Sequence, residues 1–222
     1  MVTRSLLLTA AFIAQMPVCC TILSAQTGCE PVSERGSRVL GCYITARQEL
    51  GSLPRDTLLY WHIDSFPGLA AAEAARTVRG TAVQSLGSAW LFTIAEKGWR
   101  APAGFHVAVV GPVPLAKADS LAAVYMEGVF EPGMRTAVHR HPGAEAWYTL
   151  TGEQCLETPS GKIVQKAGDP GVMVPGGEPM ILMGTGATIR RSLVLILQDA
   201  TQPRSMLATD WTPAGLCGAL GQ

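Results

Sequence analysis

Short apolar runs, each closed by glycine or proline, recur along most of this chain. β-branched and aromatic residues are common in them, which is typical of β-strands. In the first half, the runs that predict strands are residues 38–50, 57–66, 82–86, 89–95 and 105–110. In the second half, they are residues 121–130, 136–141, 145–150, 153–157, 162–165, 172–174, 180–183 and 189–197. About eight short strands with Pro/Gly turns and no helix between them predict a sandwich or a small closed barrel there.

One convincing helix interrupts the strands of the first half. Residues 69–78 (LAAAEAARTV) are rich in the best helix formers, and Gly80 ends the run. The order of elements around it predicts a small β-α-β-β segment. We therefore expect a mainly β protein in which this segment precedes a larger β unit.

The first 25 residues differ from the rest of the chain. Arg4 supplies a positive charge, residues 5–14 (SLLLTAAFIA) form an apolar run, and small residues end at Ala25. This order is typical of a signal peptide, and the run is too short to span a membrane. An N-terminal helix of the folded domain is the alternative. We expect residues 1–25 to be removed and the mature chain to be periplasmic or secreted, with no membrane partner.

Four cysteines lie outside that segment: Cys29, Cys42, Cys155 and Cys217. An even number in an exported protein permits two disulfides, and four cysteines allow three connectivities. Pairing Cys29 with Cys42 and Cys155 with Cys217 keeps one bridge local and ties the C-terminal tail to the second half. Four buried thiols are the alternative.

Composition and charge restrict the classes of binding partner that we expect for this protein. Apolar residues make up 48% of the chain and charged residues 15%, as in an ordinary globular protein. Lys+Arg and Asp+Glu balance at 17 each, so no basic surface is predicted for nucleic acid. A small molecule remains as the expected partner.

Candidate metal ligands gather in residues 133–152 (GMRTAVHRHPGAEAWYTLTG). In a strand, alternate side chains share a face, so His139 and His141 point the same way. A tight turn after His141 would bring Glu145 to the same spot on a returning strand, which makes the two strands a hairpin. Two imidazoles and a carboxylate are typical ligands of a divalent transition metal. The alternative is that these groups only stabilise the fold.

Other polar and large side chains could belong to this candidate metal site or to the core. Trp147 alternates with Glu145 and should wall the pocket, whereas Tyr148 should face the other way. His62 and His106 each stand alone in an apolar strand, where a structural role is favoured over metal binding. Tyr125 and Glu127 share one face of their strand, and that face could lie inside the fold. Met173, Met180 and Met183 could line a pocket or fill the core.

The spacing of Gly133, His139, His141, Glu145 and Gly152 resembles the first motif of the cupin superfamily. It matches that motif at every fixed position.

A partial second motif follows. Residues 175–177 (PGG) resemble the core of the second cupin motif, and the resemblance covers about residues 120–200. The family carries a histidine three residues further on as another ligand, and this chain has Met180 there.

The resemblance implies a cupin-type double-stranded β-helix, also called a jelly-roll barrel, in residues 116–200. Residues 26–115 would be the N-terminal α+β segment and residues 201–222 a tail packed on the barrel. His139, His141 and Glu145 would hold Fe, Mn, Zn, Ni or Cu in the barrel mouth, with Met180 as a fourth position. A thioether suits copper better than Fe²⁺ or Mn²⁺. By analogy with other cupins, a homodimer is expected.

Three functions follow from this resemblance. The first is a divalent metal centre that binds a small organic ligand, with dioxygenase-like chemistry as its use. The second is a non-catalytic binding or sensing protein without tightly bound metal. The third, a sugar isomerase, needs a second base opposite the first, and no further histidine is placed to supply it.

Overall fold

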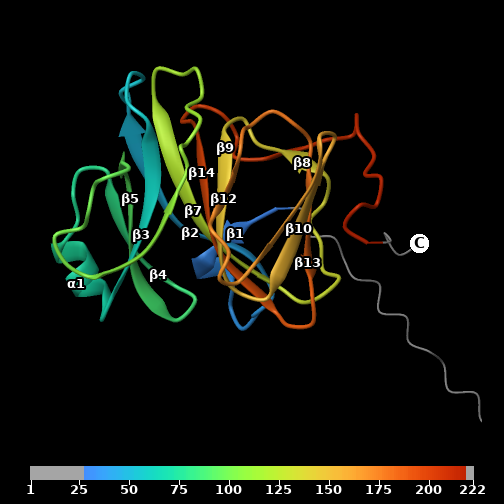
Figure 1. The fold of residues 1–222 in the computed structure, drawn as a ribbon, viewed down its shortest axis with the longest axis horizontal. Helices are drawn as coiled ribbons and strands as arrows, with labels where there is room; N and C mark the ends of the chain where they lie inside the picture. The colour runs from blue at the N-terminus through green and yellow to red at the C-terminus, as the bar shows by residue number, and fades with distance from the viewer. Residues whose placement is uncertain (1–27, 219–222) are drawn as a thin grey trace, which may run out of the picture.

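The structure of the protein is a computed structural model that describes residues 28–218 (Figure 1). Its two helical elements are η1 (Val32–Glu34) and α1 (Leu69–Ala74). The strands before residue 115 are β1 (Glu30–Pro31), β2 (Gly41–Gly51), β3 (Leu59–Phe66), β4 (Gly80–Ser85), β5 (Ser88–Glu96) and β6 (Phe105–Val110). The later strands are β7 (Leu121–Phe130), β8 (His139–Arg140), β9 (Ala144–Thr151), β10 (Glu153–Thr158), β11 (Gly161–Lys166), β12 (Val172–Val174), β13 (Ile181–Thr185), β14 (Arg190–Asp199) and β15 (Met206–Leu207). The predicted signal peptide lies outside the described residues.

Three sheets are stacked side by side (Figure 1). The central sheet has six strands in the order β1-β2-β7-β14-β9-β12. A four-stranded sheet, β4-β5-β3-β6, covers one face of it and carries α1. A three-stranded sheet, β11-β10-β13, covers the other face. The central sheet is therefore the wall shared by two hydrophobic cores.

Strand β7 shows how the sequence builds that shared wall. All ten of its residues are buried, because alternate side chains enter different cores. Ala123 and Tyr125 belong to the core beneath the four-stranded sheet. Val124 and Met126 belong to the core beneath the three-stranded sheet. A strand that is buried on both faces has a continuous apolar run, which is what β7 and its neighbour β14 have in the sequence.

The six-stranded and three-stranded sheets together form a cupin-type double-stranded β-helix. Strands far apart in sequence are neighbours in it, with β14 lying between β7 and β9. The fold class predicted from the sequence is confirmed, and β3, α1, β4 and β5 supply the expected β-α-β-β segment before it. Strand β2 comes from the first half of the chain but pairs with β7 in the wall of the barrel.

Aromatic side chains join the four-stranded sheet to that wall. Trp61 of β3 is fully buried and meets Phe92 of β5 edge-on, with ring centroids 5.5 Å apart. Phe92 in turn lies 5.0 Å from Tyr125 of β7. Burial of each such ring contributes about 1.5–3 kcal/mol, so these contacts fix the two layers against each other.

The hairpin expected between residues 136–141 and 145–150 is wrong. Strand β8 pairs with β15 from the C-terminal tail, and β9 pairs with β14 and β12 instead. The chain turns a corner at Gly143, where it runs directly against the backbone of β14. It therefore passes from one sheet to another rather than folding back on itself.

Helix α1 is shorter than expected, since it ends at Ala74 rather than at Val78. A turn closed by the Gly80 N–H and the Thr77 carbonyl, 2.9 Å apart, leads directly into β4. Thr77 and Val78 are β-branched and are weaker helix formers than the alanines before them.

Both expected disulfides are confirmed: Cys29 is bonded to Cys42 and Cys155 to Cys217. The second bridge ties the tail to β10, where the Glu157 carboxylate also accepts backbone N–H bonds from Ala214 and Leu216. Within residues 28–218, no helix has the length and apolar character that crossing a membrane requires.

The corner at Gly143 can be tested by stability. A Cβ at this position would lie 2.1 Å from the carbonyl oxygen of Leu197, and backbone cannot move away cheaply. We expect Gly143→Ala to lower the free energy of unfolding by about 3 kcal/mol or more in urea denaturation. Gly98→Ala is the matched control, because a Cβ there meets nothing, and it should change stability by less than about 1 kcal/mol. Equal stability of the two variants would contradict the close approach of the corner to β14.

Candidate metal centre

The three predicted ligands come together at the corner between β8 and β9. His139 lies in β8, His141 in the corner itself, and Glu145 is the second residue of β9. One ligand atom from each residue can be chosen so that all three lie within 4.8 Å of one another. The side chains of His141 and Glu145 are buried, and His139 is half-buried. Although the expected hairpin is absent, the corner still brings the carboxylate beside the imidazoles.

Both imidazoles are held by their Nδ1 atoms. Nδ1 of His139 lies 2.8 Å from the carbonyl oxygen of Ala137, and Nδ1 of His141 lies 2.7 Å from that of Arg204. A carbonyl oxygen only accepts, so each Nδ1 carries the proton and each neutral ring keeps its lone pair on Nε2. Such outer hydrogen bonds fix the tautomer and orientation of histidines that ligate metals.

The two Nε2 atoms point at each other. They lie 3.1 Å apart, so in the neutral rings two lone pairs would face one another. A shared proton or a cation removes that repulsion. The geometry therefore calls for positive charge between the rings.

Glu145 adds negative charge at the same point. Its Oε2 is buried and lies 3.2 Å from Nε2 of His141, and with that nitrogen unprotonated no group of the described residues donates to it. A buried carboxylate oxygen without a donor is costly unless a cation satisfies it. Two imidazole nitrogens and this oxygen thus fit a divalent transition-metal ion with open coordination positions.

The pKa of each of the three ligands is shifted by burial and by the charges of its neighbours. Burial lowers the pKa of His139, and the neighbouring His141 lowers it further. Burial alone would also lower the pKa of His141, but the Glu145 carboxylate and the Arg204 carbonyl outweigh it and raise the pKa overall. Burial would raise the pKa of Glu145, yet the two imidazoles and Arg190 lower it. In the metal-free protein, an extra proton therefore belongs on His141.

The three ligands line a cavity of about 60 Å³ inside the barrel. At roughly 10–15 Å³ for each water-sized group, this is room for about four to six such groups. Most of the wall is apolar and includes Met126, Phe130, Trp147, Leu182 and Val194. The site can thus admit a small ligand next to the ion while restricting the approach of water.

Arg190, the first residue of β14, is a cavity residue that the sequence analysis missed. Only 2% of it is exposed. Burial lowers the pKa of Arg190 to about 9, which still leaves the guanidinium charged at neutral pH. The alternation of β14 places Arg190 on the face of Val194 and Ile196, but the opposite face of this strand is equally apolar. The sequence therefore gave no sign of which arginine of the Arg190–Arg191 pair points inward.

Trp147 and Tyr148 leave β9 on opposite sides. Trp147 lines the cavity beside Glu145. Tyr148 packs against the core beneath the four-stranded sheet.

Met180 lies beside His139 but is not among the lining residues of the cavity. Two backbone hydrogen bonds join the pair, from His139 N to Met180 O at 3.0 Å and from Met180 N to His139 O at 2.7 Å. The Met180 side chain is buried in the barrel core. Met126, not Met173 or Met183, is the methionine of the cavity wall.

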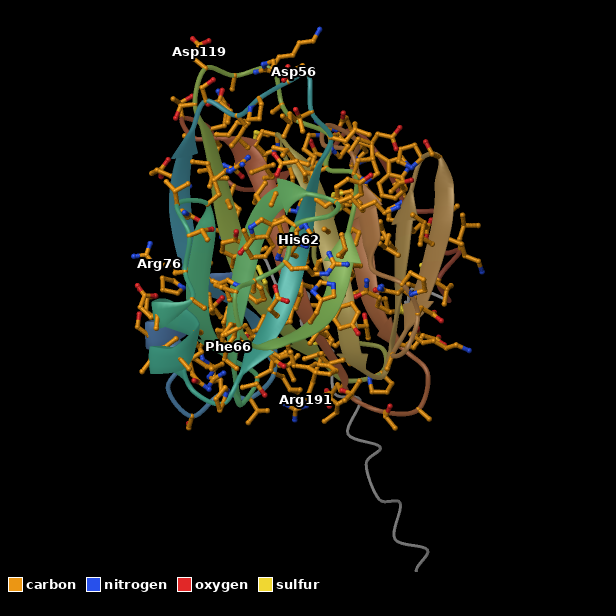
Figure 2. The ribbon with its side chains drawn as sticks, turned by 60° about the vertical axis from the view of Figure 1, so that its left-hand side comes forward. Asp56, His62, Phe66, Arg76, Asp119 and Arg191 are labelled. Atoms are coloured by element: carbon orange, nitrogen blue, oxygen red, sulfur yellow. A yellow bond between two sulfur atoms is a disulfide. The ribbon has the colours of Figure 1, made fainter. Side chains whose placement is uncertain are left out.

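The isolated histidines lie away from the cavity and have structural partners. His62 lies on β3 of the four-stranded sheet (Figure 2) and donates from Nε2 to the Glu96 carbonyl over 2.9 Å. His106 of β6 donates from Nδ1 to Asp64 over 2.8 Å. The structural reading of both histidines is confirmed.

Tyr125 and Glu127 face the four-stranded sheet rather than the cavity. The buried Glu127 carboxylate is fully satisfied. It accepts hydrogen bonds from the Ser85 hydroxyl at 2.7 Å and the Leu86 N–H at 2.9 Å, and it pairs with Arg35.

No protein-family model matches the chain, and no curated protein matches it either. Among solved structures, it is similar to a cupin superfamily protein from Desulfitobacterium hafniense, at 21% identity over 35% of this chain and 68% of that one, with a TM-score of 0.32. A conserved protein from Klebsiella pneumoniae with a double-stranded β-helix domain is 23% identical over 45% and 78% of the two chains, with a TM-score of 0.34. A DMSP lyase from Ruegeria pomeroyi is 24% identical over 40% of this chain and 42% of that one, with a TM-score of 0.31. Similarities this low carry no functional argument, and the fold assignment rests on the strand order and register described above.

Proton and metal compete for His141, which gives a pH-dependent prediction. Because its pKa is raised in the fold, protonated His141 stabilises the metal-free protein fully below about pH 6.5, and this contribution is lost as the pH rises through the folded pKa. Metal binds the ring only when Nε2 is unprotonated, so the stabilisation by metal increases as the pH rises and His141 loses its proton. We expect Zn²⁺ to raise the melting temperature more at about pH 8 than at about pH 6, measured by differential scanning fluorimetry.

His139→Ala is the control for that measurement and should lose most of the Zn²⁺-dependent rise at both pH values. A rise in the wild type that does not change with pH would contradict a site in which the ion displaces a proton from His141.

Proposed function

We propose that this protein holds a divalent transition-metal ion through His139, His141 and Glu145 and binds a small organic ligand beside it in the barrel cavity. One observation carries the proposal. Both rings commit Nδ1 to backbone carbonyls, and their Nε2 atoms meet at 3.1 Å next to a carboxylate oxygen that has no donor. With both rings neutral, these three atoms all offer lone pairs and no proton, so either a proton on His141 or a metal ion has to lie among them.

The residues of the chain have separate tasks at this site. His139, His141 and Glu145 would hold Fe, Mn, Zn, Ni or Cu and leave positions open toward the cavity. The bound ion would supply Lewis acidity and, if it is redox-active, electron transfer to dioxygen. Trp147, Phe130 and Leu182 would shield the ligand from water.

Two uses of the site are consistent with these tasks. The first is dioxygenase-like chemistry on the bound ligand, and the runner-up is non-catalytic binding or sensing. Within the described residues, the cavity wall has no imidazole or carboxylate other than the three proposed ligands. This favours either use over a sugar isomerase, which needs a separate base to move a proton.

Export to the periplasm or the medium is part of the proposal. The two disulfides support it, because such bonds persist in oxidising compartments.

The metal content of the purified, untagged chain tests the proposal. We expect the wild type to carry close to one equivalent of a transition metal by elemental analysis after dialysis. His139→Ala should reduce that content at least roughly tenfold, because it removes a ligand. His106→Ala is the matched control and should retain the wild-type content, since His106 lies in another sheet. Equal metal in wild type and His139→Ala, or none in either, would refute the metal centre.

The same assay tests Met180 as a fourth position. Directly opposed residues of an antiparallel pair project to the same side, so a histidine at this position would start beside His139. We propose that Met180→His raises the metal affinity at least roughly tenfold over the three-ligand site. Unchanged affinity would show that position 180 does not reach the ion.

A further inference from the structure

We propose that the ligand of this cavity is a small organic acid whose carboxylate lies between the metal ion and the guanidinium of Arg190. The inference rests on the proposed metal centre and names the chemical class of its ligand. Its evidence concerns Arg190 and is independent of the histidines.

Arg190 is built into the wall of the cavity. It begins β14 and stands directly opposite Phe130 of β7, whose ring centroid lies 5.3 Å from the guanidinium carbon. Both residues line the same cavity as His139 and Glu145. The guanidinium is therefore held at the cavity by the sheet itself rather than carried on a loop.

The charge of Arg190 has no direct ion-pair partner within the described residues. Glu145 is the carboxylate whose charge acts on it, but only beyond ion-pair distance, and the Nε and Nη2 atoms of Arg190 are buried without an acceptor. The guanidinium lies over the face of Phe130, a cation–π contact that supplies no counter-charge. A buried cation is costly unless it is paired, so Arg190 calls for an anion from outside the chain.

A contrast inside the same protein supports this reading. Glu127 also lies on the central sheet and is also buried, but the chain gives it Arg35, Ser85 and the Leu86 N–H as partners. The fold thus supplies direct partners to the charge of Glu127, whose role is structural. It leaves Arg190 unsatisfied only where the side chain lines the cavity.

Gly128 provides the space that the guanidinium occupies. A Cβ at this position would lie 2.5 Å from Nη1 of Arg190, and Gly128 itself lines the cavity. Any larger residue would displace the charged group from its place.

The charge of the loaded site also favours an anion. A divalent ion, two neutral imidazoles, the Glu145 carboxylate and the guanidiniums of Arg190 and Arg204 leave a net charge of three positive units around a mostly apolar cavity. At low dielectric this excess is strongly unfavourable unless the ligand is negative.

Shape and size then favour a carboxylate. The planar guanidinium fork can donate two hydrogen bonds to a planar carboxylate. A lone pair that remains on a carboxylate oxygen would bind the metal ion. Apart from Arg190 and Arg204, the side chains of the wall that can donate are Thr136, Trp147 and Ser205, and the titration below compares phosphate directly. Room for about four to six water-sized groups corresponds to acids of the size of acetate or pyruvate.

Calorimetric titration of the nickel-loaded full chain tests the inference. The probes are acetate and pyruvate, with uncharged acetamide and inorganic phosphate for comparison. We expect at least one of the two acids to bind, and to bind more tightly than acetamide and phosphate. In Arg190→Met, binding of that acid should weaken roughly ten- to hundredfold while the nickel content stays at the wild-type level.

Arg191→Met is the matched control. Arg191 is the next residue of β14, and the alternation of the strand sends it to the opposite face. It is absent from the cavity wall and lines a separate hollow with Glu127; Figure 2 labels it at the lower edge of the molecule. Arg191→Met should bind the acid as the wild type does. Ligand-free Arg190→Met should melt at or above the wild-type temperature, because it loses an unpaired buried charge.

Gly128→Ala decides the question if Arg190→Met does not fold. The added methyl group would displace a flexible side chain rather than backbone, so the sheet should form and nickel should still bind. Acid binding should fall at least roughly tenfold.

The outcomes separate the two proposals. Absence of nickel from the wild type overturns the metal centre and the inference that rests on it. Nickel without acid binding, acid binding unchanged in Arg190→Met or in Gly128→Ala, or tighter binding of phosphate overturns only the assignment of the ligand.

Discussion

The central six-stranded sheet is buried on both faces, and the rest of the structure depends on that constraint. Its strands β7 and β14 supply apolar side chains to two cores at once, so any polar group on them has to find a partner inside the protein. Glu127 finds three partners, and Thr149 and Ser192 hydrogen-bond each other at 2.9 Å. Glu145 and Arg190 are its charged residues with buried polar atoms that lack hydrogen-bond partners, and both line one cavity. The Tyr125 hydroxyl and Gln198 Oε1 are uncharged atoms of the same sheet that also lack a partner. The buried charges of this sheet that lack direct partners thus lie where a metal and a ligand are proposed.

The C-terminal tail completes this site from the far end of the chain. Strand β15 pairs with β8, which carries His139, and the carbonyl of Arg204 fixes the tautomer of His141. The disulfide between Cys155 and Cys217 anchors the end of the tail on β10. The His141 imidazole is therefore oriented by a residue 63 positions further along the chain, whereas that of His139 is held by Ala137 close by. The site is a property of the closed barrel and not of residues 133–152 alone.

Sequence reasoning succeeded where the information is local. The continuous apolar runs of β7 and β14, the Pro/Gly turns and the spacing of His139, His141 and Glu145 are short-range patterns. They were enough to predict the fold class and the ligand cluster. It failed where the answer depends on which strands become neighbours. The hairpin of β8 and β9 seemed natural because a Pro-Gly turn separates them, yet Gly143 lies against β14 and sends the chain into another sheet. Arg190 was missed for a related reason, since a strand that is apolar on both faces does not reveal which side is the cavity.

The central claim is that His139, His141 and Glu145 bind one metal ion, and diffraction from crystals grown with Zn²⁺ tests it most directly. Anomalous scattering at the zinc edge should give a peak roughly 2 Å from Nε2 of both histidines and from one carboxylate oxygen of Glu145. The Nδ1 atoms should keep their contacts with the Ala137 and Arg204 carbonyls. No peak at this point, with the two Nε2 atoms still in direct contact, would contradict the account.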